Sequence, residues 1–157
     1  TKDCLVIYDY FKLMSAESIS ASLQEYQVLG FQITTLHNFV VKYDIPCLSF
    51  VQLNRDGMTK EDESAASGSD RLIWLCSNFT IFKKKLDEEI AEEGEQNGNR
   101  KLIPIVSRHG TEWNSKDYIN MKADLDHATI REIGTSFDLK KKANTEQNEQ
   151  SGTTDNK

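Results

Sequence analysis

Three polar stretches, each at the end of an apolar segment, carry side chains that can do chemistry. Asp9 follows the apolar run CLVIY, and a carboxylate in such a place can hold a magnesium ion through a water molecule. Gln52 lies near the end of the run CLSFVQL. Its amide can donate to a phosphate oxygen or orient a water without carrying charge. Arg108 and His109 form a turn after the run KLIPIVS, where His109 can approach a phosphate.

Each of these residues also has a purely structural interpretation. Asp9 can cap the turn that follows it, and Gln52 can satisfy backbone groups at the end of a strand. Arg108 can be an exposed arginine on a turn. The elements that carry these side chains decide whether they can act together.

The N-terminal pattern predicts a strand, a helix and a second strand. Cys4–Met14 is short and almost continuously apolar around Asp9, which is typical of a strand covered by helices on both faces. An amphipathic helix is expected over Tyr26–Tyr43, and Pro46 stops it. Cys47–Leu53 is a second buried strand. The apolar stripe of the helix consists of Leu29, Ile33, Leu36, Val40 and Tyr43.

A strand, helix, strand crossover makes its two strands parallel. The fold class is therefore α/β with a mostly parallel sheet flanked by helices. The carboxyl ends of parallel strands meet at one edge of the sheet, where ligands gather. Adjacent strands lie about 5 Å apart, so Gln52 can reach a phosphate whose magnesium is held by Asp9.

The rest of the chain is expected to contain loops, a second helix and further strands, the last of them antiparallel. We interpret residues 1–138 as a domain portion and residues 139–157 as a disordered tail. We expect a long polar loop over Asn54–Gly68, a helix from near Ser69 and a strand over Phe79–Lys84. Asp87–Asn99 should be a solvated acidic insertion, to which we assign no function, and Lys101–Ser107 another strand. Tyr118–Ala123 and Thr129–Ile133 should form a hairpin around Asp124–His127.

Composition and charge place the chain among globular proteins. Of its 157 residues, 38% are hydrophobic and 28% are charged, and no apolar run is long enough to span a membrane. Cys4, Cys47 and Cys76 lie in apolar segments and are expected to be reduced core residues of a cytoplasmic protein. The net charge of −6 argues against a broadly basic surface but leaves room for cationic loops. Because a buried strand follows Thr1 almost at once, we expect the chain to begin inside a larger domain.

Several short motifs, in order from Cys4 to about Gly110, resemble one family. The first is Asp-Tyr (Asp9, Tyr10) with Leu-Met shortly after (Leu13, Met14), and the second is Ile-Pro (Ile45, Pro46) before an apolar strand. Gln-Leu-Asn-Arg (Gln52 to Arg55) follows that strand. The last two are Ser-Gly in a loop (Ser67, Gly68) and Ser-Arg-His-Gly at a later strand end (Ser107 to Gly110). Together they resemble the C-terminal half of the ATPase core of a DnaB-type, RecA-fold replicative DNA helicase, particularly of the phage kind.

The resemblance implies an ATP site shared between subunits. By this resemblance, Asp9 is the Walker B residue that holds Mg²⁺, and Gln52 senses the γ-phosphate of ATP. Arg108 reaches the neighbouring subunit's ATP as a finger, with His109 beside the nucleotide. An arginine supplied in trans requires an oligomeric ring, which in this family is a hexamer.

The same resemblance implies that single-stranded DNA is bound by loops facing a central channel. The candidate loops are Ser15–Gln24 and Arg55–Gly68, which leave the sheet after the strands carrying Asp9 and Gln52. Primase or a helicase loader is an expected partner. The expected location is the cytoplasm, that of the host if the protein is phage-encoded. The residues expected to contact DNA are Arg55, Lys60, Ser67 and Gly68.

The sequence departs from the family pattern in three respects. Val106 stands where the family has a lysine two residues before the finger arginine, and Ala65 with Ala66 replace an acidic-arginine pair before Ser67. The 157 residues contain no GxxxxGK[ST] phosphate loop. The family's catalytic glutamate is expected upstream of Asp9. We therefore expect these residues alone not to hydrolyse ATP.

Two other functions remain open at this point. A RecA-like recombinase shares the Walker B strand and the following loops but forms filaments. A catalytically silent α/β module that only binds partners is the alternative from another class, and the missing phosphate loop favours it.

Overall fold

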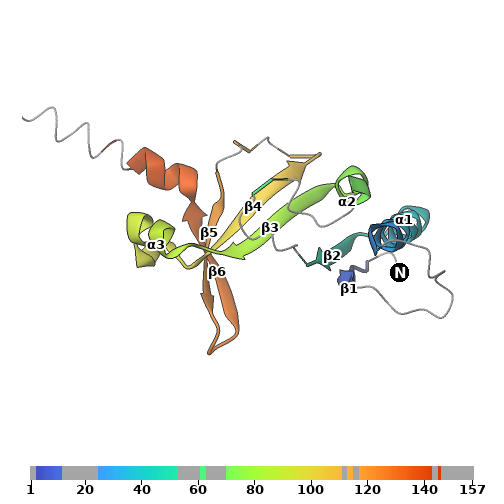
Figure 1. Ribbon diagram of the computed structural model, residues 1–157, viewed down its shortest axis with the longest axis horizontal. Coiled ribbons are helices and arrows are strands. Elements are labelled where there is room, and N and C mark those ends of the chain that lie inside the picture. Colours follow the sequence, from blue (N-terminus) through green and yellow to red (C-terminus); the bar gives the residue numbers. More distant parts are fainter. Residues whose placement is uncertain are drawn as a thin grey trace, which may run out of the picture. The chain divides into compact units, whose positions relative to one another are not determined.

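A computed structural model describes most of the chain. Two compact units are present, an N-terminal unit, Thr1–Phe79, and a C-terminal unit, Thr80–Lys157, and their elements are labelled in Figure 1. No helix in the described part of the chain is long and apolar enough to cross a membrane. The described residues are 3–11, 25–52, 61–62, 70–110, 113–114, 117–142 and 145.

The N-terminal unit contains the predicted crossover. β1 (Val6–Phe11) and β2 (Cys47–Val51) are parallel, with Val6 opposite Cys47, and α1 (Glu25–Tyr43) connects them in sequence. The predicted α/β class is confirmed by this pairing. β1 begins at Val6 and not at Cys4, and the last predicted residues of this strand, Lys12–Met14, lie outside the described residues.

A Schellman motif ends α1. Asp44 takes the left-handed conformation with φ 52°. The Ile45 N–H donates to the Val40 carbonyl at 3.0 Å, and the Asp44 N–H donates to the Val41 carbonyl at 3.3 Å. Pro46 follows and cannot continue the helix, so the helix ends at the residue predicted from the sequence.

One face of the β1–β2 sheet is exposed in the described part of the chain, where the sequence pattern predicted a covering helix. Ile7 is 63% exposed and Leu48, its direct neighbour across the sheet, is 48% exposed. Leu5 and Phe50 are similarly exposed. Phe11 instead is buried. The sequence pattern identified the apolar strands correctly. An apolar strand sequence alone does not show which face of the sheet packs against other described residues.

The second helix and the next strand are present where expected. α2 (Asp70–Leu75) is followed by β3 (Asn78–Lys84), which begins in the N-terminal unit. Arg71 donates to the Thr34 hydroxyl of α1 at 3.4 Å and lies over the Phe31 ring. Leu72 is buried, so α2 is joined to α1 by both polar and apolar contacts.

The C-terminal unit is built on a four-stranded sheet. β3, β4 (Arg100–Ser107), β5 (Ile119–Asp124) and β6 (Thr129–Thr135) follow one another in that order across the sheet. β5 runs antiparallel to both β4 and β6. The predicted hairpin and the predicted antiparallel C-terminal strands are confirmed.

The acidic segment Asp87–Asn99 lies at the surface, as its composition predicted, since neither of its two helices contains a buried residue. It forms α3 (Asp87–Glu93) and the short 3-10 helix η3 (Glu95–Asn97). The buried Lys85 ammonium contacts Glu93 Oε2 at 2.5 Å and donates to the Asn97 carbonyl at 3.0 Å. The composition of the segment did not indicate these contacts, because the lysines that pair with its glutamates lie outside it.

A further helical stretch follows β6. Residues 136–142 are helical and continue past the predicted domain boundary at residue 138. Ser136 is buried; its hydroxyl accepts from the Tyr118 N–H at 3.0 Å and donates to Asp117 at 3.2 Å. Lys140 adds a 2.8 Å ion pair to Asp117. These contacts attach the start of the predicted tail to the sheet.

Candidate nucleotide site at the edge of the parallel strands

Asp9 and Gln52 lie near the carboxyl ends of two hydrogen-bonded parallel strands. Phe11 pairs with Val51, so Asp9 precedes the last pair of the ladder and Gln52 follows it directly. Both residues are exposed. Neither side chain makes a hydrogen bond or an ion pair to another residue that the structure describes. The structure therefore brings the two predicted residues to one edge with both side chains available to a ligand.

A β-bulge interrupts β1 beside Asp9. Tyr8 pairs with Ser49 and Phe11 pairs with Val51, so β1 has one residue more than β2 over this interval. Tyr10, within the bulge, has a positive φ of 28°. Sequence reasoning did not identify the bulge, and no turn residue such as glycine marks it.

The oxygen chemistry of the site fits Mg²⁺ when phosphates complete the coordination. Mg²⁺ prefers carboxylate, phosphate and water oxygens and is commonly held by one or two carboxylates together with substrate phosphates. The Asp9 carboxylate supplies one such ligand. The described residues contain no group of three or more His, Cys, Asp or Glu side chains able to hold a metal ion by themselves. A metal at this edge would thus depend on the nucleotide.

Arg108 and His109 belong to the C-terminal unit. They follow β4 directly and are exposed. The turn is tight at Gly110, where a Cβ atom would come within 2.6 Å of the Ser107 hydroxyl. The chain thus folds back on the Ser107 side chain at this turn. The roles of Arg108 and His109 at a nucleotide remain predictions.

The four predicted DNA contacts, Arg55, Lys60, Ser67 and Gly68, lie outside the described residues. The same holds for the loop Ser15–Gln24. Their assignment therefore remains a prediction.

Sequence reasoning also missed a cluster of paired charges in the C-terminal unit. The lysine–glutamate cluster consists of Lys85 with Glu93, Lys101 with Glu89, and Tyr118, whose hydroxyl contacts Glu93. Both ammonium groups lie over the Tyr118 ring. Two signals were available: Lys101 precedes an apolar run, and Glu89 and Glu93 have the four-residue spacing of one helix face. Because its charges are paired, the cluster has a structural role.

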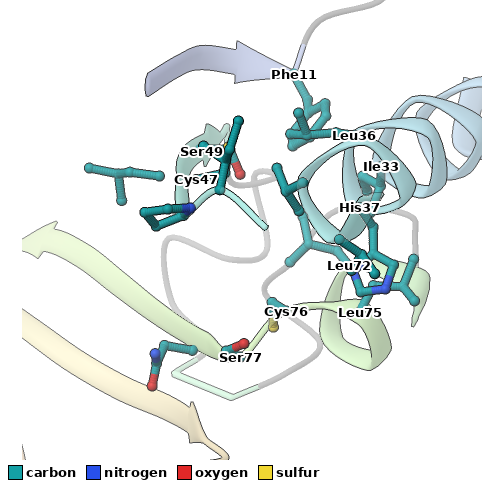
Figure 2. A pocket seen from close by; sticks show the side chains of 16 residues that line it. Phe11, Ile33, Leu36, His37, Cys47, Ser49, Leu72, Leu75, Cys76 and Ser77 are labelled. Atoms are coloured by element: carbon teal, nitrogen blue, oxygen red, sulfur yellow. The ribbon is translucent and has the colours of Figure 1, made fainter. Parts of the chain in front are cut away.

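A cavity of about 430 Å³ lies beside β2 within the N-terminal unit. Figure 2 shows Phe11 pointing from the end of β1 toward Leu36 of α1. Cys47, from β2, also lines the cavity, and burial raises the pKa of its thiol. The three cysteines are free, as predicted, but Cys4 is exposed and is not a core residue. The cavity wall is mostly apolar: Phe11, Ile33, Leu36, Val40, Leu72 and Leu75 contribute to it.

Comparison with known proteins identifies the fold. No protein-family model matches the sequence, and no curated protein matches it. A solved DnaB-like replicative helicase, studied with its interactions with primase, superposes with a TM-score of 0.61 at 16% identity over 80% of this chain and 29% of that chain. A second solved structure, an ATPase domain, superposes with a TM-score of 0.56 at 15% identity over 82% of this chain and 44% of that chain.

The chain thus spans less than half the length of either structure. Identities of 15% and 16% establish shared fold and not shared activity. The predicted fold is confirmed: the chain has the RecA-like fold of part of the ATPase domain of DnaB-type replicative helicases.

Proposed function

We propose that the chain is part of the motor domain of an ATP-driven, ring-forming replicative DNA helicase. One observation carries the proposal: the parallel pairing of β1 with β2 brings Asp9 and Gln52, both exposed, to the same sheet edge. In open α/β sheets ligands bind at this edge. The shared fold with helicase ATPase domains supports the assignment.

In the proposed site, Asp9 holds Mg²⁺ and Gln52 contacts the γ-phosphate of ATP. The metal, when bound, neutralises charge that develops on the phosphates during transfer. The Asp9 carboxylate would act on the phosphates only by holding this metal. The uncharged Gln52 amide donates to a γ-phosphate oxygen or orients the attacking water.

The missing phosphate loop would be supplied by a segment that docks beside β2. Three features of the N-terminal unit support this part of the proposal. Among the described residues β2 pairs only with β1, the cavity lies beside it, and Ile7 and Leu48 are exposed on one face of the sheet. Two-stranded sheets are marginally stable, and parallel sheets are normally covered on both faces. A strand and helix added here would cover these apolar residues and present their loop beside Gln52.

Arg108 would act on the ATP of a neighbouring subunit, with His109 beside it. A trans-acting arginine stabilises the charge of the transferring phosphoryl group and makes hydrolysis depend on assembly. A hexameric ring is the proposed assembly. Arg55, Lys60, Ser67 and Gly68 would contact single-stranded DNA in its channel, with primase or a loader as partner. The proposed location is the cytoplasm in which that DNA is replicated.

The test is ATP hydrolysis by the full-length protein that contains this chain, with and without single-stranded DNA. We expect DNA to stimulate turnover. Arg108→Ala subunits mixed with wild type should lower activity more than dilution alone, because each removes a finger from its neighbour's site. Arg131→Ala, an exposed arginine on β6, is the matched control. Equal behaviour of the two variants would reject Arg108 as the finger.

A partner-binding α/β module is the second candidate function, favoured by the absence of a phosphate loop from the 157 residues. It predicts a full-length protein without nucleotide-dependent activity. A RecA-like recombinase would hydrolyse ATP but form filaments on DNA, which electron microscopy distinguishes from closed rings.

A further inference from the structure

The bulge at Asp9 and Tyr10 changes which faces the side chains of β1 occupy. Before the bulge, Val6 and Tyr8 are half-buried while Ile7 is exposed, as expected for alternation. Regular alternation would then turn Tyr10 inward and Phe11 outward. The structure shows the reverse: Tyr10 is 42% exposed and Phe11 is 7% exposed.

Phe11 anchors this change of faces. Its ring centroid lies 4.9 Å from that of Tyr8, although residues three apart in a regular strand point to opposite faces. Phe11 also lines the cavity together with Ile33 and Leu36 of α1. The extra residue in the strand is what allows both aromatic rings to occupy the same face.

The backbone of Tyr10 is strained. A φ of 28° is disfavoured for a residue with a Cβ atom. Its side chain makes no hydrogen bond or ring contact to another residue that the structure describes. Such strain persists where the surrounding structure imposes it and is concentrated at functional sites. Here burial of the Phe11 ring imposes the strain on Tyr10, the residue that directly follows the candidate metal ligand Asp9.

The bulge also includes Asp9. In an unbulged ladder that continues the pairing of Ile7 with Leu48, Asp9 would lie directly opposite Phe50. Its carboxylate would then stand on the face that exposes Ile7, Leu48 and Phe50. Two residues, Asp9 and Tyr10, now oppose Phe50. Bulges of this kind bend and twist a strand and often re-aim a side chain next to a functional site.

We propose that Tyr10 is a positioning residue for the metal carboxylate Asp9, acting through its left-handed backbone and not through its hydroxyl. This inference rests on the proposed function, because it takes Asp9 to be the magnesium ligand. The phenol is dispensable in this role, whereas the extra residue and its positive φ are required.

Four variants separate the backbone from the side chain. Deletion of Tyr10 removes the bulge while leaving Val6, Tyr8 and Phe11 on the inner face by ordinary alternation, so the core is kept. Tyr10→Val keeps the residue but strongly disfavours the positive φ. Tyr10→Gly keeps the residue and favours that φ. Tyr10→Phe removes only the hydroxyl.

The measurement is paramagnetic broadening of amide NMR signals by Mn²⁺, used as a probe for Mg²⁺, in the full-length protein that contains this chain, with a non-hydrolysable ATP analogue bound. Asp44, an exposed carboxylate of the same unit, serves as the internal reference. In wild type we expect Asp9 and Gln52 to broaden at lower Mn²⁺ concentration than Asp44. Deletion of Tyr10 and Tyr10→Val should raise the required concentration about tenfold, the usual effect of losing support for a metal ligand. Tyr10→Gly and Tyr10→Phe should match wild type.

The outcomes distinguish this inference from the function on which it rests. Equal broadening in wild type and in the deletion would overturn the positioning role while leaving the metal site intact. Absence of preferential broadening at Asp9 in wild type would contradict the metal site and the inference together. Independently of metal, Tyr10→Gly should raise the melting temperature by relieving strain, and a lowered value would contradict a strained bulge.

Discussion

The polar side chains at the β1–β2 edge and those of the lysine–glutamate cluster differ in whether they have partners among the described residues. In the N-terminal unit, Asp9 and Gln52 are exposed and make no polar contact to any described residue. In the C-terminal unit, the side chain of Lys85 is 0% exposed and that of Lys101 is 2% exposed, and each is paired with a glutamate. Polar groups that already have partners stabilise a fold, whereas unpaired groups at a ligand-binding edge are available for chemistry. The difference separates structural residues from candidate functional ones.

The largest expected effect on stability comes from breaking the lysine–glutamate cluster. Glu93→Gln leaves the Lys85 ammonium buried without a charged partner, and loss of one member of a buried pair costs about 3–5 kcal/mol. Urea unfolding of the chain measures the change. Glu92→Gln, the exposed neighbour on α3, is the control and should be close to neutral. Equal effects of the two substitutions would show that the buried pair has no special role.

A smaller loss is expected where residues 136–142 attach to the sheet. Ser136→Ala removes the hydroxyl that accepts the Tyr118 N–H and donates to Asp117. A buried donor left without a partner costs about 1–3 kcal/mol. Ser77→Ala, at an exposed serine, should change the free energy of unfolding very little. A neutral Ser136→Ala would show that this attachment contributes nothing to stability.

Substitutions at the candidate site should leave stability almost unchanged. Asp9→Asn and Gln52→Ala remove exposed groups without partners among the described residues, so we expect changes within about 0.5 kcal/mol. The same urea unfolding experiment checks this. A large loss for either variant would show that the residue has a structural role, which would remove the contrast with the lysine–glutamate cluster.

The last and smallest expected effect is the pH dependence of stability that arises from Asp124 in the β5–β6 turn. A hydrogen bond with His127, 2.7 Å from the carboxylate, lowers the pKa of Asp124, and the N–H groups of His127 and Asp126 contribute further. Because the pKa of Asp124 is lower in the folded protein than in the unfolded chain, ionisation of Asp124 stabilises the fold. This stabilisation is fully present above the pKa of the unfolded chain, about 3.9, and is lost as the pH falls through the pKa of the folded protein. NMR titration of Asp124 should show this pKa returning toward its usual value in His127→Ala. An unchanged titration would assign the shift to the backbone donors.

Much of the fold follows from local pattern in the sequence. The stripe from Leu29 to Tyr43 predicted α1, and the apolar runs before Asp9 and Gln52 predicted its flanking strands. Pattern succeeds here because crossover connections leave few arrangements open. The hairpin turn at Asp124–His127 was similarly visible from its polar residues between two apolar segments.

The features that sequence reasoning missed depend on contacts distant in sequence. The positive φ of Tyr10 follows from burial of Phe11 against α1, which no local propensity records. The ion pairs that join Asp87–Glu93 to the sheet are made with Lys85, which follows β3, and with Lys101 of β4. The placement of Asp9 and Gln52 at one edge of the sheet could be predicted, because it needs only the ends of two parallel strands.

The decisive measurement is magnesium-dependent ATP hydrolysis by the full-length protein carrying Asp9→Asn, compared with Asp44→Asn. Both substitutions remove one exposed carboxylate from the same unit, and asparagine tolerates the left-handed conformation of Asp44. We predict that Asp9→Asn abolishes DNA-stimulated hydrolysis without loss of stability, while Asp44→Asn retains wild-type turnover. Full activity in Asp9→Asn would contradict the nucleotide site at the β1–β2 edge.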